Sequence, residues 1–202
     1  MKLWKYKDYQ EYVKSQVDGI YKHPTVRDNY NHQWFENEDI IFLKEQVISP
    51  YFSKINVIPK FGICHGAKLG KENVEFEKQT GINFIGTDIS IDSSIDMKLI
   101  KWDFHDVKDE WIENVDIIYS NALDHSYNPE LCLSQWISCL TDRGICIVEH
   151  THCHLDSTAT DPFGATLQEY CDLILSVGGK VLEIKNYTGR RRKKRFIIFT
   201  RG

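Results

Sequence analysis

The stretch that decides the fold is KFGICHGAKLGKE, from Lys60 to Glu72, followed shortly by FIGTDIS, from Phe84 to Ser90. An apolar run leads into three glycines spaced four residues apart, and a second apolar run ends in an acid. This order predicts a strand, a glycine turn, a helix and a second strand, which is one unit of a parallel sheet. The spacing differs from the G-x-G-x-x-G turn of dinucleotide-binding proteins, so the ligand must be inferred from other residues.

The composition restricts the class of protein. The chain has 202 residues, of which 42% are hydrophobic, so it is long enough for one compact core. Its formal net charge of −4 argues against nucleic acid as a partner. No stretch approaches the ~20 apolar residues of a membrane span, and the N-terminal residues lack the apolar segment of a signal peptide. The six cysteines form no C-x-x-C pair, which predicts a reduced, cytoplasmic protein.

From residue 54 onward, short β-like runs alternate with helical segments. This alternation predicts an open, Rossmann-like α/β sheet, mostly parallel, with helices on both faces. A tight, charged turn joins the last two predicted strands, so one strand near the C-terminus must be antiparallel. The predicted strands are 54–63, 83–89, 97–104, 115–121, 145–150, 180–188 and 194–201, and the predicted helices are 71–81, 129–144 and 161–179.

Residues 1–53 have a different pattern. They contain two amphipathic helical segments, at 6–22 and 37–52, and many aromatic residues. We interpret them as an N-terminal helical cap, which either forms a lid over a ligand or covers an edge of the sheet. Residues 54–202 then form the main domain.

Two acids follow the glycine turn at the carboxyl ends of the strands, where open α/β sheets bind ligands. Asp88 lies 22 residues after Gly66, close to the spacing at which a carboxylate accepts hydrogen bonds from ribose hydroxyls. Asp103, after the third strand, can accept a hydrogen bond from the amino group of an adenine. Because the sequence contains no G-x-x-x-x-G-K-[ST] run, an adenosine ligand without a polyphosphate is favoured, and S-adenosylmethionine fits this description.

Several segments also carry a resemblance to a known family. Four segments resemble, in order, motifs I to IV of the class I S-adenosylmethionine-dependent methyltransferases: ICHGAKLGKENVEF (63–76), FIGTDIS (84–90), WDFHD (102–106) and VDIIYSNALDHSYNPE (115–130). Within this family, the sequence is most similar to the methyltransferase type 11 group. WISCLTDRGICIVE (136–149) resembles the R-x-L-K-P-G-G-x-L-x-I-E segment that follows them. The resemblance implies S-adenosyl-L-methionine as cofactor, bound by Cys64, His65, Gly66, Ala67, Lys68, Gly70, Glu72, Asp88, Ile89, Asp103, Phe104, His105, Asn121, Ala122 and Leu123.

Motif I departs from the D/E-x-G-x-G-x-G pattern of the family. Gly62 stands where the family has an acid, Cys64 replaces the first glycine and Lys68 the third. We expect Glu72 to substitute for the missing acid. We also expect Gly66 and Gly70 to lie against the methionine part of the cofactor.

Histidines after the fourth and fifth strands are the candidates for catalysis. His125 is a candidate general base, needed if the acceptor must lose a proton, and His152 is a candidate for binding or deprotonating the acceptor. Both can instead be loop residues without a catalytic role. In EHTHCHLD (149–156), three alternating histidines, His150, His152 and His154, would share one face of an extended segment and could bind zinc or iron. We predict no metal, because same-face neighbours on a strand rarely converge on one ion.

The predicted function is methyl transfer to an oxygen or nitrogen of a small-molecule or glycan acceptor. A non-catalytic, S-adenosylmethionine-binding regulatory protein is the main alternative, and a nucleotide-sugar or nicotinamide enzyme is a more distant one. The basic run GRRRKKRF (189–196) has three possible interpretations: a solvated hairpin turn, a binding site for an anionic acceptor, or a contact with RNA. The sequence does not name the acceptor and leaves a homodimer open.

Overall fold

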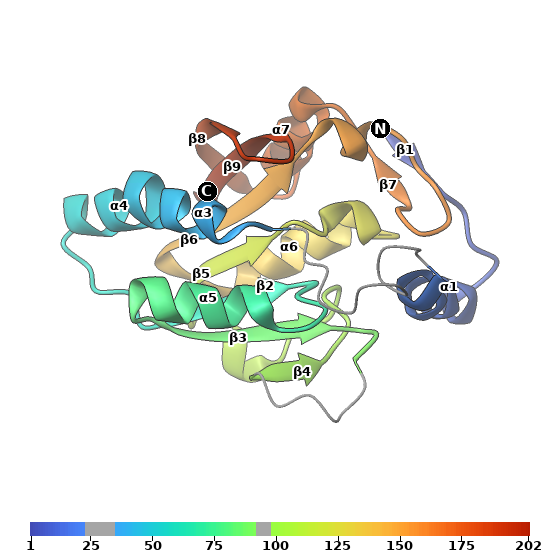
Figure 1. The fold of residues 1–202 in the computed structure, drawn as a ribbon, viewed down its shortest axis with the longest axis horizontal. Helices are drawn as coiled ribbons and strands as arrows, with labels where there is room; N and C mark the ends of the chain where they lie inside the picture. The colour runs from blue at the N-terminus through green and yellow to red at the C-terminus, as the bar shows by residue number, and fades with distance from the viewer. Residues whose placement is uncertain (23–34, 92–97) are drawn as a thin grey trace.

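The computed structural model describes residues 1–22, 35–91 and 98–202. Its centre is a seven-stranded sheet in the order β4-β3-β2-β5-β6-β9-β8 (Figure 1). Neighbouring strands from β4 to β6 are parallel, and β9 is antiparallel to both β6 and β8. The predicted open sheet with one reversed strand near the C-terminus is therefore confirmed. Its strands are β2 (Phe61–His65), β3 (Asn83–Asp88), β4 (Leu99–Lys101), β5 (Val115–Ser120), β6 (Leu140–His150), β8 (Gly179–Thr188) and β9 (Lys193–Arg201).

Helices cover both faces of the sheet, as predicted. Because the central strands are covered on both sides, apolar side chains point to both faces: in β5, Ile118 belongs to one core, and Ile117 and Tyr119 belong to the other. The first core is completed by α6 (Pro129–Cys139) and α7 (Leu167–Ser176), and the second by α3 (Asn37–Leu43), the π-helical turn η1 (Lys44–Ile48), α4 (Ser49–Lys54) and α5 (Lys71–Thr80). No helix in the described ranges is long and apolar enough to cross a membrane.

Some predicted element ends are wrong. The first large strand begins at Phe61 rather than at residue 54, because the chain up to Lys54 belongs to α4. The last helix, predicted from residue 161, begins only at Leu167. There Thr166 and Glu169 form a capping box, in which each side chain accepts a hydrogen bond from the backbone of the other.

The helix that was predicted to run to Gly144 ends at Cys139, and the residues after it already belong to β6. The register of β6 against β5 shifts between Val115 and Ile117, which indicates a bulge. A β-carbon on Gly144 would lie 2.7 Å from the carbonyl oxygen of Val115. The glycine therefore permits a close approach of two strands and does not end a helix.

The N-terminal segment divides into two parts. α1 (Tyr9–Lys22) lies beside the carboxyl ends of the strands, whereas α3, η1 and α4 pack on a face of the sheet (Figure 1). A two-residue strand, β1 (Lys2–Leu3), pairs with β7 (Phe163–Gly164) and anchors the chain before α1. α1 and the helices α3 and α4 thus occupy different places around the sheet. Three short turns, η2 (Asp109–Trp111), η3 (Leu123–His125) and η4 (His152–Leu155), complete the described elements.

Candidate active site

A cavity of about 310 Å³ opens at the carboxyl ends of β2, β3, β4, β5 and β6, and α1 forms one wall. The predicted site residues that line it are Gly66, Lys68, Asp88, Ile89, Asp103, Phe104, Asn121, Ala122 and His125. The tips of three strands, which carry Gly66, Asp88 and Asp103, thus converge on a single cavity. The other residues of the lining, which were not among the predicted cofactor-binding or catalytic residues, are Tyr12, Ser15, Gln16, Gly19, Ser90, Asp124, Glu149, Cys153, His154, Thr160, Asp161 and Arg192.

The turn after β2 brings the backbone close to the loop after β5. Gly66 has a φ of +72°, and a β-carbon there would lie 2.4 Å from the β-carbon of Ala122. A side chain at this position would be strained and would clash, so glycine is required. Lys68 continues the turn with a φ of 48°. Gly70, with a φ of 70°, precedes the first residue of α5 and lies behind the lining.

Asp88 closes the turn from the neighbouring strand. Its Oδ2 accepts a hydrogen bond of 2.8 Å from the backbone N–H of Lys68, and its Oδ1 accepts bonds from the backbone and hydroxyl of Ser90. The carboxylate is buried but faces the cavity. Because each carboxylate oxygen has two lone pairs, Oδ2 can accept one further hydrogen bond from a ligand.

Asp103 is held by a chain of hydrogen bonds. Its Oδ1 lies 2.6 Å from Nδ1 of His105, whose Nε2 lies 2.7 Å from the hydroxyl of Ser126, and its Oδ2 accepts a bond of 2.8 Å from Tyr9 of α1. Burial raises the pKa of Asp103, but the hydrogen bonds and charge of His105 outweigh burial and lower it overall. His105 is buried behind the lining and orients the acid from there.

A buried charged cluster lies behind the wall formed by β6. The ammonium group of Lys194 is 2.6 Å from Oδ2 of Asp39 and 3.0 Å from Oε2 of Glu149, and Glu149 lines the cavity. Burial lowers the pKa of Lys194, but the two carboxylates raise it above its usual value. Lys194 belongs to the basic run 190–195, so the interpretation of that whole run as a solvated hairpin is wrong at this residue. Arg192, in the same run, lines the cavity.

Glu72 does not reach the cavity, although we expected it to replace the missing acid of motif I. It is buried, and its Oε1 accepts a hydrogen bond of 2.7 Å from the amide of Asn121, which does line the cavity. Burial raises the pKa of Glu72 to about 8, against the effect of that hydrogen bond. Glu149 is the acid that faces the cavity instead.

Other predicted residues support the lining from behind. The ring of His65 stacks on Trp136 with centroids 4.9 Å apart, and its Nδ1 lies 2.8 Å from the hydroxyl of Thr87. Burial lowers the pKa of His65 to about 3, so this ring is neutral. The predicted residues that lie outside the lining are Cys64, His65, Ala67, Gly70, Glu72, His105, Leu123 and His152.

The segment EHTHCHLD does not stay extended. β6 ends at His150, and Thr151 accepts a hydrogen bond from the N–H of Cys153 and begins the turn η4. His150 is buried, with its Nε2 3.0 Å from the carbonyl oxygen of Ala165, whereas His152 is exposed. The three histidines therefore do not share one face, and His152 lies away from the cavity.

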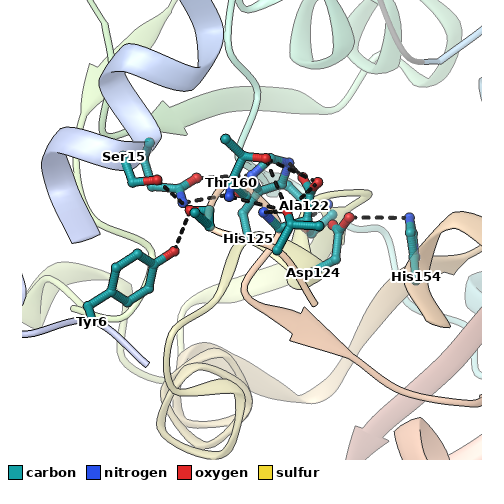
Figure 2. Close-up of polar contacts among 12 residues, drawn as sticks. Tyr6, Ser15, Ala122, Asp124, His125, His154 and Thr160 are labelled. Atoms are coloured by element: carbon teal, nitrogen blue, oxygen red, sulfur yellow. Dashed lines mark hydrogen bonds and ion pairs between the residues drawn. The ribbon is translucent and has the colours of Figure 1, made fainter. Parts of the chain in front are cut away.

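His154 joins a second group of polar residues on the α1 side of the cavity. Figure 2 shows its ring directed at the carboxylate of Asp124, with Nε2 3.7 Å from Oδ2. His125, the next residue after Asp124, has its Nδ1 3.0 Å from Oε1 of Gln16 and its Nε2 3.6 Å from Oδ1 of Asp161. The sequence predicted His125 from its place after a strand, but Gln16 and Asp161 come from distant segments.

Comparison with known proteins gives the same fold. No protein-family model matches the sequence, and no curated protein sequence matches it either. A 1,6-didemethyltoxoflavin-N1-methyltransferase from Burkholderia thailandensis, solved with S-adenosylhomocysteine, is 11% identical with a TM-score of 0.70, over 98% of this chain and 92% of that one. The chain has the class I methyltransferase fold.

Two further structures show how widely this fold is used. A magnesium protoporphyrin IX methyltransferase from Synechocystis PCC 6803, solved with S-adenosylmethionine, is 11% identical with a TM-score of 0.63, over 98% of this chain and all of that one. The [4+2]-cyclase SpnF is 9% identical with a TM-score of 0.60, over 78% of this chain and 81% of that one. At these identities the likeness establishes the class I methyltransferase fold and leaves the reaction to the residues of the site.

Proposed function

We propose that the protein is an S-adenosylmethionine-dependent methyltransferase that acts on an oxygen or nitrogen of a small-molecule or glycan acceptor. The observation that carries this proposal is the convergence of Gly66, Asp88 and Asp103 on one cavity at the ligand-binding edge of a class I fold. The similar enzymes are named for acceptors as different as a toxoflavin precursor and a magnesium porphyrin. The fold therefore supports the reaction class and leaves the acceptor open.

The residues of the cavity fit an adenosyl ligand with a charged amino acid part. The absence of a side chain at Gly66 lets the turn after β2 approach Ala122 closely at the cavity wall. Asp88 and Asp103 each retain a lone pair on Oδ2 for a donor such as a ribose hydroxyl or an adenine amino group. Glu149, a buried carboxylate in the lining, shares one ammonium group, that of Lys194, with Asp39, and we assign to it the binding of the cofactor's ammonium group that we had expected of Glu72.

The cofactor, when bound, supplies a methyl group on a positively charged sulfur, which is a good leaving group. The chain must then hold the acceptor atom in line with the bond between the methyl carbon and sulfur, and keep water out. Such positioning can lower the activation barrier by about 7–11 kcal/mol. α1 is suited to this task. The hydroxyls of Tyr6 and Ser15 both donate to the carbonyl of Ala159, and the amide of Gln16 donates to that of Thr160, so the helix is fixed to the loop before β7 (Figure 2).

An acceptor hydroxyl must lose its proton during the reaction, whereas a neutral amine can attack the methyl group before it loses a proton. We propose His125 for this role, because it lines the cavity and its Nε2 lies 3.6 Å from Oδ1 of Asp161. His152 has no part in this mechanism, because it is exposed and lies outside the lining.

Calorimetry with S-adenosylhomocysteine tests the proposal. We expect micromolar binding by the wild type and no binding of NAD. Gly66→Ala should weaken binding of S-adenosylhomocysteine by at least about tenfold, because the new methyl group clashes with Ala122. Gly81→Ala is the matched control: Gly81 also has a φ of +72°, but a β-carbon there meets nothing within 4 Å. Equal weakening by both variants, or no binding by the wild type, would reject the proposed cofactor site.

A binding protein without turnover is the second candidate. The altered motif I favours it, because Gly62 stands where the family has an acid and lies against Phe84 in the core. A screen for products heavier by one methyl group, with labelled cofactor and a cell extract, separates the two functions. Binding of S-adenosylhomocysteine without any labelled product would favour the regulatory role.

A further inference from the structure

Three metal-ligating side chains meet on the α1 side of the cavity. Asp124 and His125 lie in η3 after β5, and Asp161 lies in the loop before β7. Each offers one ligand atom, and these atoms all lie within 4.8 Å of one another. The cluster combines two carboxylates with one imidazole, so it is a mixed donor set and not a patch of acidic residues alone.

The hydrogen bonds of Gln16 fix the tautomer of His125. The amide nitrogen of Gln16 donates to the carbonyl oxygen of Thr160 at 3.1 Å, so its oxygen must face Nδ1 of His125 at 3.0 Å. An oxygen can only accept, and therefore Nδ1 carries a proton. In the neutral ring Nε2 then carries a lone pair, and this lone pair points toward Asp161.

The lone pair on Nε2 of His125 therefore faces a carboxylate oxygen, and a second imidazole lies at a similar distance from Asp124. Nε2 of His125 lies 3.6 Å from Oδ1 of Asp161, and Nε2 of His154 lies 3.7 Å from Oδ2 of Asp124. Both distances are too long for a hydrogen bond. Two lone pairs that face each other repel unless a positive charge lies between them.

Buried atoms without partners give a second, independent indication. Asp124 and His154 are both buried, with side chains that are 11% and 7% exposed. Oδ1 of Asp124 and Nδ1 of His154 have no hydrogen-bond partner. A buried carboxylate that is not fully satisfied is costly in an ordinary core, whereas a bound cation compensates it.

We propose that Asp124, His125 and Asp161 bind a divalent first-row cation, with His154 in a supporting position beside Asp124. Two atoms bound at about 2.1 Å to a tetrahedral ion lie about 3.4 Å apart, close to the observed 3.6 Å. The second shell is in place, because Gln16 holds His125 and two threonines, Thr158 and Thr160, reach Oδ2 of Asp161. One imidazole with two carboxylates suits Zn²⁺, Mn²⁺ or Fe²⁺.

The cation defines the class of acceptor, a step that rests on the proposed methyltransferase function. A hydroxyl oxygen bound to a divalent cation loses its proton to solvent more readily, because the positive charge stabilises the oxyanion. That oxygen then forms the new bond to the methyl carbon, as the bond from this carbon to sulfur breaks and leaves a neutral thioether. His125 is a ligand in this state, and the cation replaces the ring as the means of acidifying the hydroxyl. The acceptor is thus a small molecule with an acidic or chelating hydroxyl group.

Metal binding is measurable without any acceptor. Purified protein, freed of metal by chelation, is titrated with Mn²⁺ while electron paramagnetic resonance reports the free ion, and a parallel titration uses Zn²⁺ with calorimetry. We expect one ion per chain. Asp161→Asn and His125→Gln should each raise the Kd at least about tenfold, since the first removes a negative charge and the second replaces an imidazole nitrogen by a weaker amide oxygen.

The controls come from the same part of the chain. His152→Gln and Asp156→Asn change an exposed histidine and an exposed aspartate outside the cluster, and neither should alter the Kd. Binding of S-adenosylhomocysteine by every variant verifies folding and tests the cofactor site separately. If the wild type binds S-adenosylhomocysteine but binds neither metal at millimolar concentration, the proposed metal site is wrong and the proposed cofactor site stands. Equal Kd values for cluster and control variants would also overturn the metal site.

Discussion

Lys194 is the residue whose replacement should affect stability most. Its ammonium group contacts Asp39 and Glu149 at 2.6 and 3.0 Å, and all three side chains are buried. Lys194→Met keeps most of the apolar part of the side chain and removes the charge. Two carboxylates then remain in the interior without a counter-ion.

The expected loss follows from this arrangement. Removing one partner of a buried ion pair costs about 3–5 kcal/mol of unfolding free energy. Because one ammonium group serves two carboxylates, we expect the upper part of that range, about 4–5 kcal/mol. The total free energy of unfolding of a domain is about 5–15 kcal/mol, so the variant should lose at least about a quarter of its stability. The midpoint of thermal unfolding should fall on the order of 10 °C.

Urea denaturation, followed by the fluorescence of the buried Trp111 and Trp136, measures this loss. Lys193→Met changes the exposed neighbour in β9 and should shift the unfolding free energy by less than about 0.5 kcal/mol. The loss in the Lys194 variant should shrink as the pH is lowered, because a protonated carboxyl group is cheaper to bury. If both variants are as stable as the wild type near neutral pH, the reasoning is refuted.

Two further predictions concern the pH dependence of stability and the attachment of α1. Burial raises the pKa of Glu72 to about 8, so its contribution to stability is fully present below the unfolded pKa of 4.5 and is lost as the pH rises toward 8. The unfolding free energy of the wild type should therefore fall by up to about 1.4 kcal/mol per pH unit in that range, and Glu72→Gln should abolish this fall. Identical pH profiles for the two proteins would contradict this. Tyr9→Phe removes the hydrogen bond to Asp103 and should speed amide exchange in α1 about fivefold, while Tyr187→Phe, in β8, leaves it unchanged; equal exchange in both variants would show that this bond does not hold α1.

The sequence predicts the sheet well, because its signals are local. Alternating apolar runs and glycines locate the strands, and the tight turn before β9 requires an antiparallel pair. The end of α6 could not be predicted, because Gly144 is needed for a contact with the backbone of Val115 in another strand. Its place after a helix made it resemble a helix stop.

The residues of the site likewise divide into those that local sequence signals predict and those that depend on distant contacts. Gly66 and Asp88 follow strand ends, so topology alone brings them to one edge. Lys194 could not be separated from its basic neighbours, because a run of like charges hides the two-residue alternation of the strand. Asp161 could not be foreseen either, since its place beside His125 depends on a loop that is tied to α1.

The distribution of the thiols has a practical consequence. Cys64, Cys132, Cys139 and Cys146 are buried and Cys171 is half-buried, whereas Cys153 is exposed in the cavity wall. A maleimide dye or a spin label should therefore attach first at Cys153, without any engineered cysteine. The native chain thus offers its own reporter position, from which the arrival of a candidate acceptor can be read as a change in emission or in label mobility.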